Sequence, residues 1–252
     1  MLGEDHFIVF ANFEKEVNNI PASLNPPPHK RVYAAIIQET VNGKLVWQWD
    51  ATKFPEFYGN SVDQDGNGFS DSTPTDYIHL NSMVLDPSDS NLIVSFRSLN
   101  QIVKIDRHTG SILWRLGGKN SDFPLEFTQR FLGQHFVKFL DDNKTIMFVD
   151  NGNVIARPST RILEFRLDEV NKKVAYFNAY KIPERYIPYR GSVQKVGENL
   201  LITGGGYDDG IILLTDPKTD RYLFHLKTKN QQCFYRSYWV DSIYGLEKSQ
   251  RL

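Results

Sequence analysis

Two histidines and an arginine stand out as residues that could do chemistry together. His79 and Asn81 share the string DYIHLNS, and His135 lies in GQHF. Arg97 falls within the apolar run LIVSFRSLN, which we interpret as a strand, and a buried guanidinium is costly without an anion partner. Arginine offers a planar fork of donors to sulfate or phosphate, and a neutral imidazole can act as a nucleophile or carry a proton. If neighbouring strands bring these residues into one channel, they suit a tetrahedral anion.

Each of these residues could also have a purely structural role. Residue type and spacing alone do not decide between the structural and the catalytic role. A histidine at the start of a strand is often a hydrogen-bonded structural residue. Arg97 could form a buried salt bridge with an aspartate, and Asn81 could cap a turn. Only convergence of the side chains would favour the catalytic interpretation.

The elements that must position these residues belong to a repeated unit of short strands. Each copy reads as a strand, a tight turn, a second strand, an Asp or Asn with Gly, and an aromatic-rich strand. The clearest copy is residues 91–118, and Trp114 lies in its last strand. The copies cover or end in residues 41–51, 91–118, 144–180 and 199–226.

Three strands per copy, with return segments such as IHLNSMVLD supplying a fourth, predict an all-β chain that folds as a β-propeller. About four blades are visible, and we expect a single domain over residues 1–252. A β-sandwich with accidentally similar hairpins is the alternative. The long polar segment 52–77 is expected to form an insertion loop on one face, where propellers build their sites.

The composition excludes several classes of protein. The chain has 252 residues, a formal net charge of -1 and 40% apolar residues, so it can bury a core and offers no electrostatic case for nucleic acid. No apolar run approaches the ~20 residues of a membrane span. Cys233 is the single cysteine, which rules out a disulfide within the chain.

One loop has the spacing of a calcium site. Carboxylates and an amide stand at positions 1, 3, 5 and 9 of a calcium loop, with Gly68 at position 6. Position 12 is Pro74, so Asp76 would have to replace the usual bidentate acid. A solvated Asp/Gly loop is the alternative to a structural calcium ion. The four candidate ligands are Asp63, Asp65, Asn67 and Asp71.

The order and spacing of several strings resemble the arylsulfate sulfotransferase family over about residues 45–245. These strings are DYIHLNS, NLIVSFRSLNQIVKIDRHTGSILWRLGG, GQHF, FVDNGN followed by TRILEFRLDE, and FYRSYWVDSIYG. The resemblance implies an enzyme built on a six-bladed propeller. It would take a sulfuryl group from an aryl sulfate onto a histidine and pass it to a phenol, with no nucleotide donor and no required cofactor.

The resemblance also implies roles for individual residues. His79 and Asn81 match the family's HxNS element, and Arg97 matches its strand arginine. His135 matches the histidine of the family's glutamine-histidine element, and we assign it as the acceptor of the sulfuryl group. We expect His79 to protonate the leaving oxygen and later to deprotonate the acceptor phenol. Gln134 is a further candidate for contact with the substrate.

The sequence departs from the family in two places. Relatives carry another active-site histidine just before a segment like GEDHFIVFANFE, where this sequence begins, so we expect an N-terminally truncated or shortened relative. Phe136 stands where many relatives have an acidic residue. The alternative function is a catalytically inactive propeller that acts as a binding or scaffold module. Relatives are mostly periplasmic, although residues 1–20 show no signal-peptide pattern.

Overall fold

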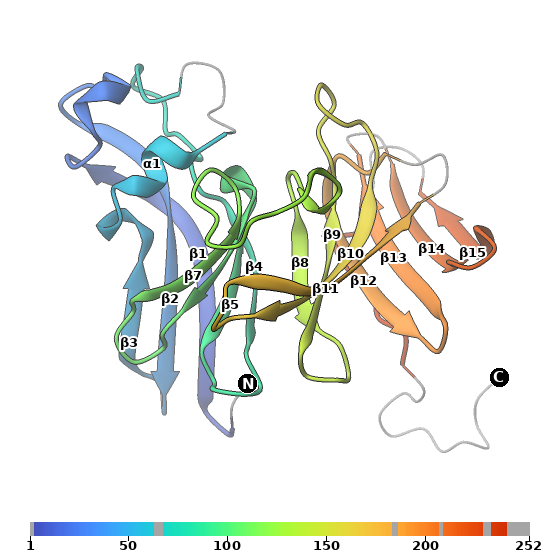
Figure 1. Cartoon of the computed structure of the whole chain (residues 1–252). Coiled ribbons are helices and arrows are strands. Elements are labelled where there is room, and N and C mark those ends of the chain that lie inside the picture. The colour runs from blue at the N-terminus through green and yellow to red at the C-terminus, as the bar shows by residue number, and fades with distance from the viewer. Residues whose placement is uncertain (1–2, 63–67, 183–185, 207–208, 229–232, 241–252) are drawn as a thin grey trace. The chain divides into compact units, whose positions relative to one another are not determined.

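The computed structural model describes residues 3–62, 68–182, 186–206, 209–228 and 233–240 (Figure 1). Within these residues, fifteen strands are accompanied by one short α-helix and four 3-10 turns. The strands form one three-stranded and three four-stranded antiparallel sheets, each made of consecutive strands. Successive sheets of this kind are the blades of a propeller, and they confirm the prediction of an all-β propeller fold.

The chain packs as two compact units. The first comprises Met1–Asp150 with Leu163–Ala179, and the second comprises Asn151–Ile162 with Tyr180–Leu252. The first unit contains the first two sheets and most of the third, and the second unit contains the fourth sheet. All the described residues predicted to do chemistry lie in the first unit. The single domain expected from the sequence stays a prediction.

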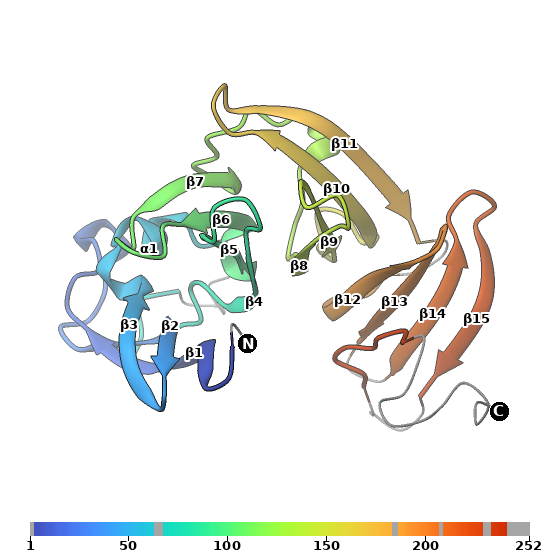
Figure 2. The same ribbon diagram turned by 90° about the horizontal axis from the view of Figure 1, so that it is seen from below.

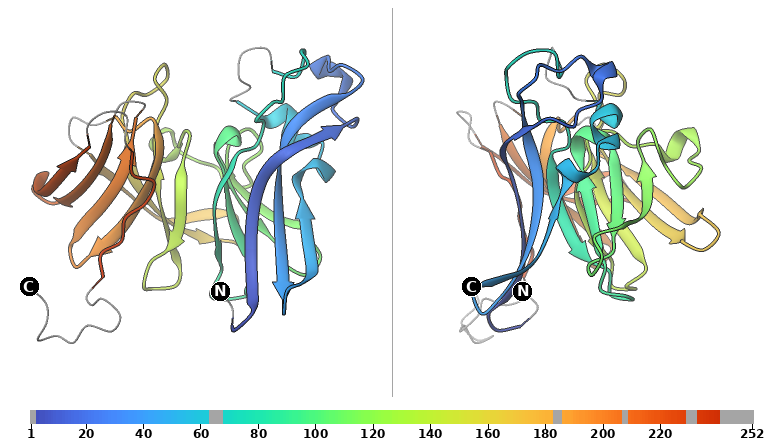
Figure 3. Two further views of the ribbon diagram at one scale, coloured as in Figure 1. Left: turned by 180° about the vertical axis from the view of Figure 1, so that it is seen from behind. Right: turned by 90° about the vertical axis from the view of Figure 1, so that its left-hand side faces the viewer.

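The first sheet is built on two twelve-residue strands and a tight hairpin (Figure 3). Asn42 and Gly43 join the second and third strands with φ of 50° and 73°. Asn and Gly accept this left-handed backbone at low cost, which is why the pair closes a two-residue hairpin. The strands are β1 (His6–Val17), β2 (Lys30–Val41) and β3 (Lys44–Asp50).

The other three sheets are four-stranded meanders. Strand β4 lies beside β1 and beside β8, so the first strands of the first three sheets are neighbours (Figure 2). The second sheet has β4 (Leu80–Leu85), β5 (Leu92–Phe96), β6 (Gln101–Ile105) and β7 (Ile112–Gly117). The third has β8 (His135–Phe139), β9 (Thr145–Asp150), β10 (Arg161–Asp168) and β11 (Lys173–Lys181). The fourth has β12 (Tyr189–Val196), β13 (Asn199–Gly205), β14 (Gly210–Asp216) and β15 (Arg221–Lys227).

Apolar side chains fill the spaces between neighbouring sheets of the first unit. One buried cluster includes Ile37, Trp49 and Phe96 of the first two sheets, and a second includes Trp114 and Phe148 of the second and third. Burial of this apolar area is the main source of stability that holds adjacent blades together.

The segment 52–77 covers the first cluster rather than only looping over the surface. It contains most of η2 (Ala51–Lys53) and all of α1 (Glu56–Asn60). Four of its aromatic side chains are buried, with relative exposures of 0–2%. They are Phe57, Tyr58, Phe69 and Tyr77. No helix among the described residues is long and apolar enough to cross a membrane.

Candidate active site

His79 is held by a carboxylate at the entrance to β4. Its Nδ1 contacts Oδ2 of Asp76, and the two side chains are 39% and 25% exposed, so the pair can be reached from solvent. Because a carboxylate can only accept here, Nδ1 carries the proton and Nε2 is left to meet a substrate. Tyr77 between them is fully buried, and burial raises its pKa well above the ordinary value of 10.

Arg97 lies next to His79, although not in the middle of a strand as predicted. Strand β5 ends at Phe96, and Arg97 opens the 3-10 turn η3 (Arg97–Leu99). The strand stops because Asn100, at φ 52°, adopts the left-handed backbone that closes a tight turn. The Arg97 amide donates to the carbonyl oxygen of His79 over 3.0 Å, so the structure brings these two residues together.

His135 begins β8 with its ring almost entirely enclosed. The residue is 5% exposed, and its Nδ1 lies 3.0 Å from the carbonyl oxygen of Gly133. A carbonyl oxygen can only accept, so Nδ1 carries the proton in this arrangement. The unprotonated nitrogen of the neutral ring is then Nε2, which is the nitrogen that could act as a nucleophile.

Hydrogen bonds join the start of β4 to the start of β8. The Asn81 side-chain nitrogen donates to the carbonyl oxygen of Gln134 over 2.7 Å, directly before His135. The Ser82 hydroxyl donates to Asn81 Oδ1 over 3.2 Å and accepts from the Val137 amide over 2.9 Å. Asn81 is therefore placed beside the backbone that carries His135.

Gln134 ties β8 to the second sheet. Its side chain is fully buried, and Nε2 donates to Ser95 Oγ at 3.1 Å, to Phe96 O at 3.1 Å and to Gln101 O at 2.9 Å. The amide nitrogen is thus directed to the neighbouring sheet. Contact between Gln134 and the substrate stays a prediction.

The four candidate residues share one edge of the first unit. Leu80, at the start of β4, pairs with Phe96, at the end of β5, so His79 and Arg97 flank the same end of these strands. The Asn81–Gln134 bond sets the start of β8 at that end as well. The backbone segments that carry His79, Asn81, Arg97 and His135 therefore lie at the same end of these strands.

Asn12 is a positioning residue that sequence reasoning missed. From β1, its side-chain nitrogen donates to Leu80 O over 2.7 Å, and its oxygen accepts from Leu80 N over 3.1 Å. This pair of bonds fixes the residue that stands between His79 and Asn81. The available signal was an asparagine near the end of the otherwise apolar string FIVFANF.

In each four-stranded sheet, the pairing between the first and second strands shifts register near the start of the first strand. In β4, the step from Leu80 to Ser82 faces the single step from Phe96 to Ser95, so one residue is extra. In β8, the step from His135 to Lys138 likewise faces only two steps of β9. Such β-bulges redirect side chains and are frequent beside active sites.

The calcium prediction falls mainly on residues that are not described. Asp63, Asp65 and Asn67 lie outside the described residues. Asp71 Oδ1 accepts from the Thr73 amide at 3.0 Å and from its hydroxyl at 2.6 Å, and the ammonium of buried Lys30 lies 2.8 Å from Asp71 O. Across the described part of the chain, no group of three or more His, Cys, Asp or Glu side chains could hold a metal. The calcium site stays a prediction.

Two solved structures are similar to this chain at low sequence identity. A protein of unknown function from Bacteroides caccae is 12% identical, with a TM-score of 0.44, and the match covers 79% of this chain and 56% of that one. The Dos1 propeller is also 12% identical, with a TM-score of 0.39, covering 81% of this chain and 44% of that one. The chain thus spans about half the length of these solved structures.

No curated protein matches the sequence. The family model described as Arylsulfotransferase (ASST) matches residues 28–238, which is most of the chain and includes all the residues discussed above except Asn12. This protein therefore belongs to the arylsulfotransferase family.

Proposed function

We propose that this protein moves a sulfuryl group from an aryl sulfate to a phenol through a sulfohistidine at His135. Family membership supports sulfotransferase chemistry in general. The observation that carries the specific proposal is the hydrogen bond from Asn81 to the carbonyl of Gln134, because it joins the edge that holds His79 and Arg97 to the strand that begins with His135.

In the first half-reaction, His135 Nε2 attacks the sulfur of the aryl sulfate. A nitrogen–sulfur bond forms, and the bond from sulfur to the aryl oxygen breaks, with its electron pair leaving on the phenolate. Arg97 and Asn81 stabilise the charge on the sulfuryl oxygens. Because a phenolate leaves readily, positioning and charge stabilisation supply most of the catalysis.

In the second half-reaction, the oxygen of an acceptor phenol attacks the same sulfur. The nitrogen–sulfur bond breaks and returns its electron pair to His135, while His79 Nε2 takes the phenol proton. Asp76 holds His79 in the orientation and tautomer that this step needs. The two half-reactions share a covalent intermediate, so the kinetics should be ping-pong.

The test uses p-nitrophenyl sulfate as donor and phenol as acceptor. His135→Ala should lower kcat/KM by several orders of magnitude, since it removes the nucleophile. His29→Ala removes an exposed histidine and should leave the activity unchanged. With donor alone, intact-protein mass spectrometry should find a sulfuryl adduct on the wild type and none on His135→Ala.

Unchanged turnover in His135→Ala would remove the assignment. Binding of the donor by the wild type, with neither turnover nor adduct, would instead favour the binding-module alternative.

A further inference from the structure

The first sheet lacks the equivalent of one strand that the other sheets have. In its last hairpin, the pairing of β2 with β3 shifts register at an extra residue, Val46. The pairing of β6 with β7 shifts at Leu113, and that of β14 with β15 shifts at Leu223. An aromatic residue directly follows the extra residue in all three strands. Strand β3 is therefore the equivalent of the fourth strands β7 and β15, so the first sheet has no first strand among the described residues.

Strand β1 consequently has one open edge. It takes the place of the second strands β5 and β13, each of which pairs with a strand on both sides. In the part of the chain that the structure describes, β1 pairs with no strand other than β2. The other edge of such a strand presents backbone N–H and C=O groups that a further strand can bind.

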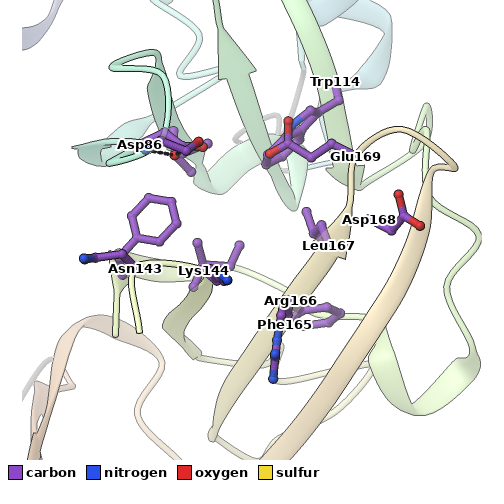
Figure 4. Close-up of a pocket in the computed structure, with 13 residues that line it drawn as sticks. Asp86, Trp114, Asn143, Lys144, Phe165, Arg166, Leu167, Asp168 and Glu169 are labelled. Carbon is purple, nitrogen blue, oxygen red and sulfur yellow. Dashed lines mark hydrogen bonds between the residues drawn. The ribbon is translucent and has the colours of Figure 1, made fainter. Parts of the chain in front are cut away.

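One face of β1 is also largely uncovered. Between the second and third sheets, side chains from both sheets surround a common space, as Trp114 of β7 and Leu167 of β10 do in Figure 4. Phe7, Val9 and Phe13 of β1 point to one face, because side chains an even number of residues apart share a face of a strand. They are 38%, 50% and 48% exposed. An edge strand with three exposed apolar side chains is the kind of surface to which another strand adds.

The second unit contains a segment, after its last strand, that lies like a first strand. In the first unit, the amide of Val137 on β8 donates to the hydroxyl of Ser82 on β4 over 2.9 Å. In the second unit, the amide of Ser237 donates to the hydroxyl of Ser192 on β12 over 3.3 Å. Ser82 and Ser192 are equivalent, because each is the first paired residue after the register shift near the start of its strand. The segment around Ser237 therefore lies on the fourth sheet as β8 lies on the second.

The contact continues along this segment. Two residues after Ser192, the Gln194 side chain accepts from the amide of Trp239 over 2.8 Å and donates to its carbonyl oxygen over 3.1 Å. The matching two-residue steps, from Ser192 to Gln194 and from Ser237 to Trp239, indicate that the segment is extended and runs in the same direction as β12. Residues 234–240 thus have the place of a first strand, which is the strand that the first sheet lacks.

We propose that residues 234–240 of one copy of the chain pair with the open edge of β1 in a second copy. The segment supplies the first strand of a complete sheet, and β1, β2 and β3 supply the other three. Both sides of the contact are apolar, since Tyr238, Trp239 and Val240 are exposed on the segment. Because the two surfaces differ, the copies join head to tail into rings or open chains. This proposal concerns assembly and does not depend on sulfuryl transfer.

The first test is sedimentation of the full chain over about a hundredfold range of concentration. The wild type should associate and reach the mass of a dimer or a larger assembly. Val9→Lys puts a charge beside the open edge of β1 and should raise the dissociation constant at least about tenfold. Val46→Lys, at a similarly exposed position on the opposite edge strand of the same sheet, should associate like the wild type. A wild type that is monomeric at every concentration, or equal effects of the two lysines, would overturn the proposal.

The second test identifies the two surfaces. Photoreactive p-benzoylphenylalanine replaces Tyr238, and this protein is mixed with wild type labelled with nitrogen-15. Irradiation should join the unlabelled segment to a labelled peptide from β1, which mass spectrometry recognises by its isotope. The same amino acid in place of Tyr176, an exposed tyrosine of the third sheet, should not cross-link to β1. If no cross-link joins the two isotopes, or if the labelled peptides lie outside β1, then β1 does not receive this segment from a second copy.

Discussion

In both candidate histidines, His135 and His79, the tautomer of the imidazole is fixed by the group that contacts its Nδ1. Gly133 offers His135 a backbone carbonyl, and Asp76 offers His79 a carboxylate. The first partner fixes a tautomer without adding charge, which suits a nucleophile. The second also carries a negative charge beside the ring, which suits the proton-accepting role that we propose for His79.

Asp76→Asn tests this difference. The amide has the size of the carboxylate but lacks its charge, and it can present a donor to Nδ1 and so favour the wrong tautomer. We expect kcat with p-nitrophenyl sulfate and phenol to fall at least about tenfold while KM changes little. Asp220→Asn, at an exposed position of a hairpin, serves as the control. A normal kcat in Asp76→Asn would show that His79 does not depend on its partner.

The sequence identifies the candidate site residues more readily than their partners. His79, Asn81, Arg97 and His135 are visible because they are polar residues within or beside apolar runs. Asp76 lies close in sequence, but its contact depends on the turn before β4, which periodicity does not describe. Asn12 is 68 residues from Leu80, and its contact depends on the packing of β1 against β4.

At the scale of the strands, an ion pair between Glu39 and Arg107 connects the first two sheets. Glu39 on β2 accepts from Arg107, in the hairpin between β6 and β7, with an Nε–Oε2 distance of 2.9 Å. His6 on β1 lies 2.6 Å from the other carboxylate oxygen. Glu39 is 7% exposed, and the hydrogen bond from Arg107 lowers its pKa from 4.5 to about 2.

This pKa shift gives the stability a defined dependence on pH. The folded pKa of Glu39 lies below its unfolded value, so the contribution is fully present above pH 4.5 and is lost as the pH falls towards 2. Glu39→Gln should lower the free energy of unfolding at neutral pH by about 2 kcal/mol, between the values for exposed and fully buried pairs.

Urea denaturation at several pH values measures this effect. The wild type should lose stability between pH 4.5 and 2 more steeply than Glu39→Gln, because the amide cannot titrate. Glu16→Gln, an exposed control, should follow the wild type. Parallel pH profiles for the wild type and Glu39→Gln would contradict the assignment.

Hairpins whose turn residues specify the turn can be predicted from the sequence. Segments whose conformation depends on packing against distant strands cannot. Asn42-Gly43 specifies its own turn, and the Asp106–Gly110 hairpin is held by its own Asp side chain, which accepts from the amides of His108 and Thr109. The apolar run predicts that β5 continues through Arg97. The strand instead ends at Phe96, because the left-handed backbone of Asn100 closes a tight turn there. The aromatic side chains of segment 52–77 are buried against distant strands, which its polar composition conceals.

For the whole chain, the repeated strand pattern is enough to predict an all-β propeller, because each copy buries its apolar faces against a neighbour. The sequence does not contain the division into two compact units, since that division depends on how the strands pack. The number of blades in the complete propeller stays a prediction.

Each unit has buried apolar residues of its own, so we expect unfolding in more than one step. Leu213 is fully buried in the second unit, and Leu213→Ala should cost about 3 kcal/mol there. In urea, this variant should lower the midpoint of one transition and leave the other unchanged. Leu116→Ala, at a fully buried position in the first unit, should do the reverse. A single transition that both variants shift equally would show that the units unfold together.

The extra residue near the start of β8 makes the length of this strand as important as its composition. Side chains alternate between the two faces of a sheet, and the extra residue between His135 and Lys138 resets that alternation. Removing Phe136 would therefore restore an unbroken ladder and leave the later residues of β8 in register with β9. His135 would keep Val149 as its cross-strand partner, and the deletion would remove the left-handed backbone at Phe136, with φ 60°, that bends the chain directly after His135.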